Sequence, residues 1–416
     1  MTRSPAEPHV DRLPDLPLPD ASRYPFDPPP EYARLRAESP VLKVACPTGI
    51  TAWLVTGYAD ARAVLSDSER FSTRPGPAAH ILTYLKPDDP VWEGQFARMD
   101  GPDHLRFRRY LAPEVSTPKR LAELRPLVQR IVDERLDALA TAPHPVDLYA
   151  DFARPTTTSV LAEMLTVPYS DRALFHQASG AVFDMATTGE ELERAMAPLF
   201  EYLFGLVARR RAEPGDDAIS RMIARAEASD RPFTELEVVM AAGTLLVAGL
   251  DTTASLVAHG LLMLLTHPDE LARLRERPEW TATAGDELVR YLSVGVGLLR
   301  EVVTDTEIGG QRVAAGDFVV VAVQAANRDP ALCPDPDRFD VGRTGVAHLG
   351  FGHGPHQCIG RPLAQVQVAA VLGTVTRRIP TLRLAVPLSE ISFRDDLATI
   401  TPRVLPVTWD ELRPAS

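Results

Sequence analysis

The longest apolar helix predicted by this sequence limits the possible folds more than any other feature. Thr234 and Glu237 form a capping box, in which each side chain can bond the backbone N–H of the other residue. The apolar helical pattern then continues to His267-Pro268, where proline stops a helix. At ~1.5 Å per residue, roughly 32 residues make a rod about 48 Å long. Such a rod has to run through the middle of a large folded body.

The composition is that of an ordinary globular protein: of its 416 residues, 45% are hydrophobic and 24% are charged. The formal net charge of −12 argues against nucleic acid or an anionic membrane as the main partner, because both attract basic proteins. The longest apolar run, Val238 to Leu250, is well short of the ~20 residues that cross a bilayer. Prolines and charges within residues 1–20 also break the apolar stretch that a signal peptide needs. We therefore expect a cytoplasmic protein with no membrane anchor.

The pattern along the chain predicts a mainly α fold with a minor β region. Residues 1–30 are rich in proline and should run extended over the surface, and residues 31–416 are expected to form a single domain. Helical periodicity dominates from Asp103 to Arg277, and residue alternation with glycine turns predicts strands between Asp305 and Val323. The other expected elements are a strand at 52–56, a helix at 58–65, a long loop at 73–94 and a final strand pair within 382–409.

A glycine-rich loop contains the strongest candidate for chemistry. Cys358 lies in the segment 348–360, directly before an apolar helical run. Glycine lets backbone approach a flat ligand, and the free N–H groups at a helix start favour a thiolate. Two alternatives are a small buried hydrophobe and a zinc site with His353 and His356, although the second ligand pair of a structural zinc site is missing. Cys46 and Cys333 complete neither a disulfide framework nor a CxxC motif, so we expect reduced thiols.

This loop closely resembles the haem-binding signature of the cytochrome P450 family. The fixed positions of that signature are all filled, by Phe351, Gly354, His356, Cys358 and Gly360. The resemblance implies the cytochrome P450 fold of a soluble bacterial, actinobacterial-type member, with its long central helix over a b-type haem (iron protoporphyrin IX). In that family the cysteine thiolate is the proximal iron ligand and favours O–O cleavage. The histidine two positions earlier contacts a haem propionate, and these roles transfer to Cys358 and His356.

Glu287, Arg290 and Arg338 resemble the structural charge triad of the same family. Glu287 and Arg290 are spaced i,i+3 on a predicted helix, which alone indicates a surface pair contributing ~0.3–0.5 kcal/mol. The resemblance adds Arg338 and implies that the three side chains lock the haem-binding core. We assign them a role in folding and none in catalysis.

Three cations match positions that contact the haem propionates in the family. His104 and Arg108 are spaced i,i+4 on a helix opened by Gly101-Pro102, and by themselves they indicate a solvated basic face. The resemblance implies that both bind propionates, as does Arg300, since paired cations suit a dianion.

Asp251 and Thr252 interrupt the most apolar part of the long helix. Unpaired buried polar groups cost ~1–3 kcal/mol, and the simplest explanation is a hydroxyl bonded to its own helix backbone. Gly249 beside them is expected to leave room for a small molecule. The resemblance implies the oxygen-activation motif, in which the threonine steadies dioxygen and the aspartate helps to relay protons. Because both are present, oxygen-dependent monooxygenation is expected rather than a peroxide-only reaction.

The resemblance also implies where a hydrophobic small-molecule substrate would bind. Gly295 and Gly297 stand where many relatives have a Pro-Val pair, and Thr401-Pro402 replaces a common Gly-Leu, so the pocket shape should differ from theirs. The expected pocket residues are Ile81, Leu82, Leu85, Phe183, Leu245, Ala248, Val294, Val296, Leu298 and Ile400.

The expected partners are dioxygen, a separate ferredoxin and its reductase, with the chain acting as a monomer in natural-product biosynthesis. No electron-transfer module is evident, and Arg106, Arg109 and Arg361 form a candidate basic patch for an acidic ferredoxin. The alternatives to hydroxylation or epoxidation are oxidative coupling or skeletal rearrangement, and a haem-thiolate protein that binds ligands without turnover. An all-helical zinc hydrolase is the least favoured alternative.

Overall fold

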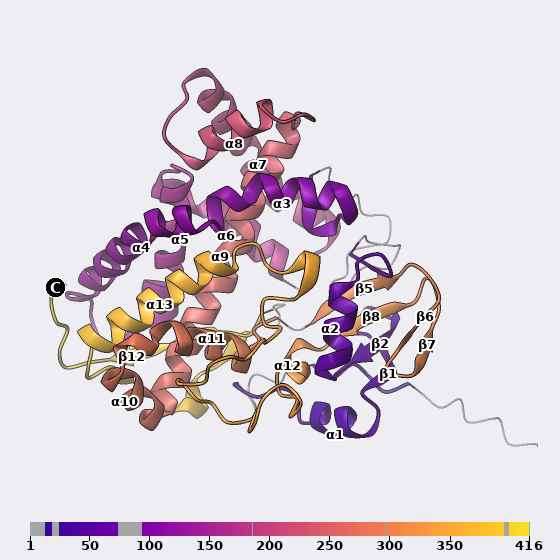
Figure 1. The fold of residues 1–416 in the computed structure, drawn as a ribbon. Helices are drawn as coiled ribbons and strands as arrows, with labels where there is room; N and C mark the ends of the chain where they lie inside the picture. The colour runs from indigo at the N-terminus through magenta and orange to yellow at the C-terminus, as the bar shows by residue number, and fades with distance from the viewer. Residues whose placement is uncertain are drawn as a thin grey trace, which may run out of the picture.

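The computed structural model describes residues 13–18, 25–73, 94–184, 186–295, 297–394 and 399–415. A large helical part carries a smaller β region at one side, with the C-terminus at the opposite side (Figure 1). The mainly α fold with a minor β region is therefore confirmed. Of the predicted N-terminal and pocket segments, 1–12, 19–24, 74–93 and residue 296 lie outside the described residues.

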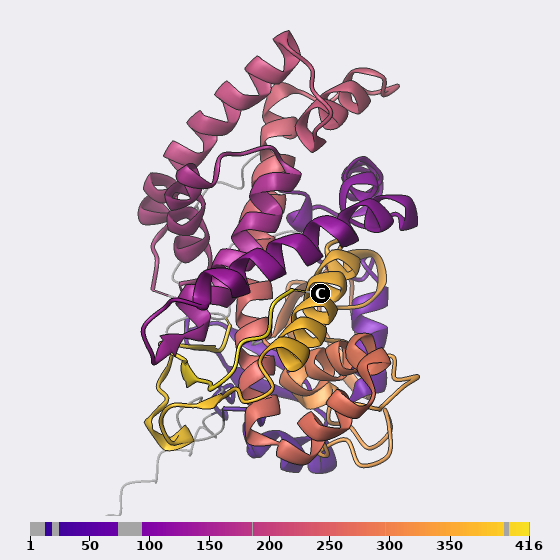
Figure 2. The ribbon, with the colours of Figure 1, turned by 90° about the vertical axis from the view of Figure 1, so that its left-hand side faces the viewer.

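The long helix α9 spans Glu235–Thr266 and forms the centre of the molecule. It starts at the predicted capping box, with Thr234 Oγ1 accepting from the N–H of Glu237 and the Glu237 carboxylate accepting from the N–H of Thr234. Figure 2 shows it running through the helical part from top to bottom. By length and composition it could cross a membrane, but 83% of its most apolar window is buried inside the fold. Its hydrophobicity is therefore satisfied by packing against other helices.

Helices from both halves of the chain surround α9. Helices α5, α6, α7, α11 and α13 pack against it, and α4 packs against α13. The bounds are α3 Gly101–Val115, α4 Pro118–Leu139, α5 Arg154–Met164, α6 Arg172–Phe183, α7 Gly189–Ala212, α8 Ala218–Glu227, α10 Pro268–Glu276, α11 Thr281–Leu292, α12 Val323–Ala326 and α13 Arg361–Arg378. One apolar core extends across these helices.

The β region is a five-stranded sheet in the order β1-β2-β8-β5-β3, covered by α1 and α2 (Figure 1). The predicted strand and helix near residues 52–65 are confirmed, as is the hairpin turn at Gly309-Gly310, where both residues have positive φ. The elements are α1 Glu31–Glu38, β1 Val41–Ala45, β2 Thr51–Val55, α2 Tyr58–Ser66, β3 Phe71–Ser72, β5 Leu298–Val302, β6 Thr306–Ile308, β7 Gln311–Val313 and β8 Phe318–Val321.

The C-terminal strands form two small sheets instead of the single predicted pair. β12 (Pro406–Thr408) pairs with β9 (Arg383–Leu384) and also with β4 (Val146–Asp147) from the helical half. β10 (Phe393–Arg394) pairs with β11 (Thr401–Pro402). The pairing with β4 joins segments that are far apart in sequence, and no local pattern predicts it.

The proline-rich N-terminal segment is extended where it is described, but it does not simply cover the surface. Leu16 N–H donates to the Ala45 carbonyl at 2.8 Å, and Ala45 N–H donates to the Pro14 carbonyl at 2.9 Å. The side chain of Leu16 is buried in the same apolar cluster as Leu54. The expectation of a surface-running segment was therefore wrong at this point, because the residues between the prolines still pair with the edge of β1.

Candidate active site

Cys358 lies at the end of the glycine-rich loop, three residues before α13 begins at Arg361. Its N–H donates to the Phe351 carbonyl at 2.8 Å, which folds the loop back on itself. Its side chain is accessible to solvent, although the surrounding protein still desolvates the sulfur. Burial raises the pKa of the Cys358 thiol, while the N–H groups of Gly360 and Arg361 and the guanidinium of Arg108 lower it. The N–H groups at the helix start therefore lower the pKa of the thiol as expected, but burial raises it by more. A positive centre beside the sulfur is needed to hold a thiolate.

The conformation of this loop depends on two glycines, Gly352 and Gly354, at which a larger residue would strain or shift the backbone. Gly352 and Gly354 have φ values of +71° and +70°. A Cβ on Gly354 would lie 2.4 Å from the Leu65 carbonyl oxygen at the end of α2. The loop therefore packs directly on α2, and glycine is required both for its backbone angle and for this close approach.

The three predicted propionate-binding residues interact with the cysteine loop or with one another. His104 is buried and stacks on His356 with 3.9 Å between ring centroids. Burial, followed by the nearby cations, lowers the pKa of His104 to about 4, so it is neutral near pH 7. Arg108 donates to the Gln357 carbonyl, and the buried Arg300 donates to the Leu299 carbonyl.

These two arginines have no carboxylate partner in the part of the chain that the structure describes. Their guanidinium groups donate to backbone carbonyls there instead, and burial lowers the pKa of Arg300 to about 10, opposed by the more distant charge of Asp100. Arg300 is buried and Arg108 is half-buried, and cations in such places are costly when no anion contacts them directly. They therefore indicate a site for an anionic group.

Asp100 is a site residue that the sequence did not reveal. Its Oδ1 lies 2.9 Å from His356 Nε2, and its carboxylate also accepts from the Ser72 and Thr73 hydroxyls. Burial alone would raise the pKa of Asp100, but these hydrogen bonds hold it well below its usual range. In the sequence Asp100 looks like an ordinary helix cap, although its side chain caps nothing. His356 was expected to face a propionate, and here its Nε2 faces Asp100.

One face of α9 is accessible although most of the helix is buried. Thr244, Ala248 and Thr252 are spaced by four residues and are the accessible side chains along this stripe. The Thr252 hydroxyl donates to the Ala248 carbonyl at 2.7 Å. Gly249 does not open this face: a Cβ there would contact Leu161 of α5 at 3.3 Å, so its small size serves helix packing instead.

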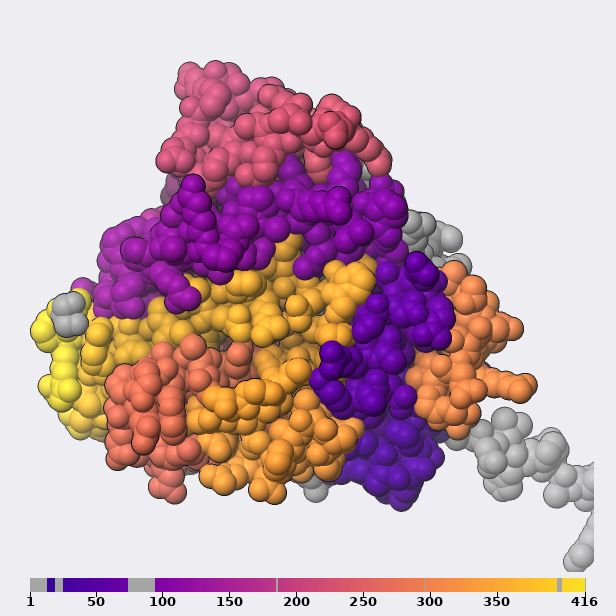
Figure 3. Space-filling model, viewed as in Figure 1, coloured from indigo at the N-terminus to yellow at the C-terminus, as the bar shows by residue number. Residues whose placement is uncertain are grey.

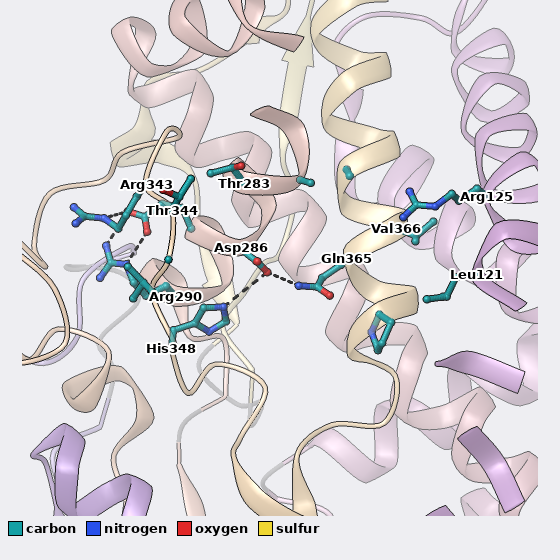
Figure 4. Close-up of a pocket in the computed structure, with 16 residues that line it drawn as sticks. Leu121, Arg125, Thr283, Asp286, Arg290, Arg343, Thr344, His348, Gln365 and Val366 are labelled. Carbon is teal, nitrogen blue, oxygen red and sulfur yellow. Dashed lines mark hydrogen bonds and ion pairs between the residues drawn. The ribbon is translucent and has the colours of Figure 1, made fainter. Parts of the chain in front are cut away.

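The charge triad is present, but one of its predicted members was wrong. Glu287 and Arg290 form a fully buried ion pair at 2.7 Å, and the third side chain on Glu287 is Arg343, at 3.1 Å (Figure 4). Arg338 is exposed and offers only its backbone carbonyl, which accepts from Arg290 and Arg343. Arg343, five residues further along the loop, contacts the Glu287 carboxylate, whereas the side chain of Arg338 is exposed to solvent.

The predicted substrate-pocket residues divide into three groups. Ala248 is exposed, and Phe183, Val294 and Leu298 are half-buried. Leu245 and Ile400 belong to the main apolar core. The remaining positions, Ile81, Leu82, Leu85 and Val296, lie outside the described residues.

Arg106 does not belong to the predicted basic patch. Its guanidinium lies 2.7 Å from Glu237 at the start of α9 and 3.6 Å from the ring centroid of Phe233. Arg106 therefore ties α3 to α9. Arg109 is exposed and Arg361 is half-buried, and both lie on elements that meet on the face shown in Figure 3.

The residues around Cys358 fit an iron porphyrin. An accessible thiol can bind iron, Arg108 and Arg300 can neutralise two propionates, and the loop glycines allow backbone to approach a flat ring. Among the described residues, no group of three His, Cys, Asp or Glu side chains could hold a bare metal ion. This combination defines the class of haem-thiolate proteins.

Comparison with known proteins agrees with this class. The family model described as Cytochrome P450 matches residues 174–278 and 281–382. Nocardicin C N-oxygenase of Nocardia uniformis subsp. tsuyamanensis is 41% identical over 399 residues, covering 94% of this chain and 99% of the relative. Mycinamicin IV hydroxylase/epoxidase of Micromonospora griseorubida is 38% identical over 386 residues, covering 91% and 94%. The structure of CYP105P1 in complex with filipin I is similar with a TM-score of 0.89 and 40% identity, covering 96% and 99%.

The chain belongs to the cytochrome P450 family, and it is a haem-dependent monooxygenase.

Proposed function

We propose that this enzyme hydroxylates or epoxidises a hydrophobic small molecule in natural-product biosynthesis. The observation that carries the proposal is the accessible stripe Thr244, Ala248 and Thr252, which leaves space beside the Asp251-Thr252 pair. The names of the two relatives, an N-oxygenase of nocardicin C and a hydroxylase/epoxidase of mycinamicin IV, support oxygen insertion into complex metabolites. Residues 31–416 would act as one catalytic domain, as a cytoplasmic monomer.

In this proposal the Cys358 thiolate would bind the haem iron. Bound haem supplies the activation of dioxygen, and the thiolate favours cleavage of the O–O bond. Arg108 and Arg300 would hold the propionates and would gain there the direct anionic contacts that the described part of the chain does not give them. His104 and His356 complete this rim, His356 being oriented by Asp100. Phe351 and Gly360 shape the loop around the sulfur.

Thr252 and Asp251 of α9 would hold and move the protons that the reaction needs. The Thr252 hydroxyl donates its only hydrogen to the Ala248 carbonyl, yet its lone pairs can still accept from a donor in the cavity. Breaking that intrahelical bond costs about 1 kcal/mol and lets the hydroxyl donate instead. Asp251 can then restore the proton. In this way the two residues would deliver protons from the Thr252 hydroxyl, while the apolar side chains of the helix keep bulk water out.

We also propose that electrons come from a separate acidic ferredoxin with its reductase. Arg109 on α3 and Arg361 at the start of α13 flank the cysteine loop and give this face positive charge on a chain of net charge −12. Local cations of this kind guide an acidic partner and raise its association rate.

The test combines a spectrum with a substrate screen. Reduced holoenzyme with carbon monoxide should show the thiolate-type Soret band, and Cys358→Ser should lose that band while retaining its helical circular dichroism. Hydrophobic metabolites that change the iron spin state would then be incubated with ferredoxin, reductase and oxygen-18, and products analysed by mass spectrometry. One labelled oxygen atom per product is expected. Coupled or rearranged products without label, or spin shifts without any product, would contradict the proposal.

A further inference from the structure

The structure joins two segments that we expect to line the substrate site. Gly295 forms an isolated antiparallel bridge with Thr399. These residues are the chain neighbours of Val294 and Ile400, two of the predicted pocket positions. A Cβ on Gly295 would meet no atom within 4 Å, so there is open space beside the bridge. The bridge therefore holds the two segments together at the edge of that space.

A buried hydrogen bond attaches the second of these segments to the central helix. The hydroxyl of Thr401, the first residue of β11, lies 2.6 Å from the hydroxyl of Ser255 on α9, and either oxygen can be the donor. Both residues are fully buried, so water does not compete for this bond. Thr401 is also a position at which the sequence departs from the family pattern, and the glycine that is common there could not form the bond.

These contacts fix the buried residue Ile400 on both sides. It lies between Thr399, which belongs to the bridge, and Thr401, which is bonded to α9. The paired strand β10 also lies against this helix, since the ring centroid of Phe393 is 5.5 Å from that of His259. Ile400 therefore keeps one distance from α9 for as long as the hydrogen bond is made.

Ser255 lies three residues after Thr252, whose hydroxyl belongs to the accessible stripe of α9. Residues three apart are neighbours on a helix surface and are separated by a rise of about 4.5 Å. The hydrogen bond therefore holds β11 within one turn of the oxygen motif. The position of Ile400 is set relative to the residue from which we propose that protons are delivered.

We infer that Thr401 is a positioning residue that, through Ser255, holds Ile400 close to α9 and so limits the space for substrate beside Thr252. A substrate that reaches Ile400 is then held at one depth, and one of its atoms is presented for oxygenation. Neither hydroxyl forms or breaks a bond to the substrate. This inference rests on the proposed monooxygenase function and its substrate site.

The test compares two probes that bind ferric haem iron through a nitrogen atom, imidazole and 4-phenylimidazole. Both shift the Soret band of the holoenzyme, so their dissociation constants are measured without turnover. Thr401→Val and Ser255→Ala should each lower the dissociation constant of 4-phenylimidazole at least threefold, because Ile400 can then move away from the phenyl ring. The constant for imidazole should not change. Thr401→Ser keeps the hydroxyl and should behave as wild type.

The double variant and a matched control separate positioning from a general loss of stability. Because both substitutions break one hydrogen bond, the double variant should match the single variants, and additive effects would overturn the inference. Thr374→Val is the control, because the buried Thr374 hydroxyl accepts from Gln129 Nε2 at 2.9 Å and joins α13 to α4. It loses a hydrogen bond of the same kind and should keep both wild-type constants.

The outcome that overturns the inference is distinct from failure of the proposed function. If Thr401→Val loses the thiolate-type Soret band of the carbon monoxide complex, Ser255→Ala carries the test. An unchanged or raised dissociation constant of 4-phenylimidazole in Ser255→Ala with that band intact overturns the role of Thr401. A wild type that binds both probes but forms no oxygen-18-labelled product contradicts the proposed function instead.

Discussion

At the scale of single residues, Glu287 shows how a buried charge depends on all of its partners. Its carboxylate is 1% exposed and is shared by Arg290 and Arg343. Arg343 also donates to the carbonyls of Pro334 and Asp335. Its side chain therefore joins α11 to the loop that leads to Cys358.

Arg343→Gln should destabilise the fold by about 2–3 kcal/mol, because a buried carboxylate loses one of its two charged donors. Arg338→Gln is the matched control and should change stability by no more than about 0.5 kcal/mol, since that side chain is exposed. Urea denaturation of both variants measures the difference. Equal destabilisation by the two substitutions would contradict the assignment of Arg343 to the triad.

His259 makes the fold sensitive to acid. This residue of α9 is 2% exposed and lies between the rings of Phe26 and Phe393. Burial lowers its pKa from 6.5 to about 4, and the carbonyls of Pro25 and Ile400 offset this only in part. The folded state therefore keeps His259 neutral at a pH where the unfolded chain binds a proton.

Because the folded pKa is the lower one, stability should fall as the pH drops from about 6.5 to about 4, with a loss of about 2 kcal/mol at pH 5 from this residue. His259→Leu should remove that part of the loss while packing against the same rings. Unfolding free energies at pH 7.5 and pH 5 for both proteins measure it. A variant with the same pH dependence as wild type would show that His259 is not the titrating group.

Site residues that interrupt a local sequence pattern could be proposed from the sequence. Those that are distinguished only by long-range contacts were missed. Cys358, Asp251 and Thr252 interrupt local patterns, so they could be found without a structure. Asp100 and Arg343 belong to acidic and basic residue types that are common on surfaces, and only long-range contacts distinguish them.

At the scale of elements, the cysteine loop depends on how closely it approaches α2. Gly354 and Gly345 have similar positive φ values, +70° and +74°. A Cβ on Gly354 would clash with backbone atoms, whereas a Cβ on Gly345 would meet nothing within 4 Å. The two glycines therefore separate the effect of close packing from the effect of backbone strain.

Gly354→Ala should shift the loop and lower both the melting temperature and the haem content of the purified protein. Gly345→Ala should cost only the strain of about 1 kcal/mol that a positive φ imposes on alanine. Differential scanning calorimetry and the ratio of Soret to protein absorbance measure these effects. Haem retention that is equally reduced in the two variants would contradict the role of the α2 contact.

Elements with a strong local signal were predicted to within a residue or two, and short strands were not. The capping box and the proline after His267 set the ends of α9. The strands β4 and β10 have two residues each, and they exist only because a distant partner pairs with them. Period and turn residues say little about a strand of that length.

At the scale of the whole molecule, positive charge beside the cysteine loop opposes the acidic total. Arg109→Glu should slow electron transfer from an acidic ferredoxin about tenfold at low salt, with the difference shrinking as salt rises, because screening weakens the interaction of exposed charges. Arg194→Glu is the control: its side chain is 70% exposed on α7. Stopped-flow reduction at several ionic strengths measures the rates, and equal rates for the two variants would contradict partner docking at this face.

The double duty of α9 limits how such an enzyme can diversify. Most side chains on this helix are buried in the core, and along its middle Thr244, Ala248 and Thr252 form a narrow accessible stripe of small residues. Random mutagenesis along α9 should therefore yield mostly unfolded proteins and few new specificities. Laboratory evolution toward new substrates should progress faster through the half-buried segments that we expect to line the substrate site, such as those around Phe183 and Val294.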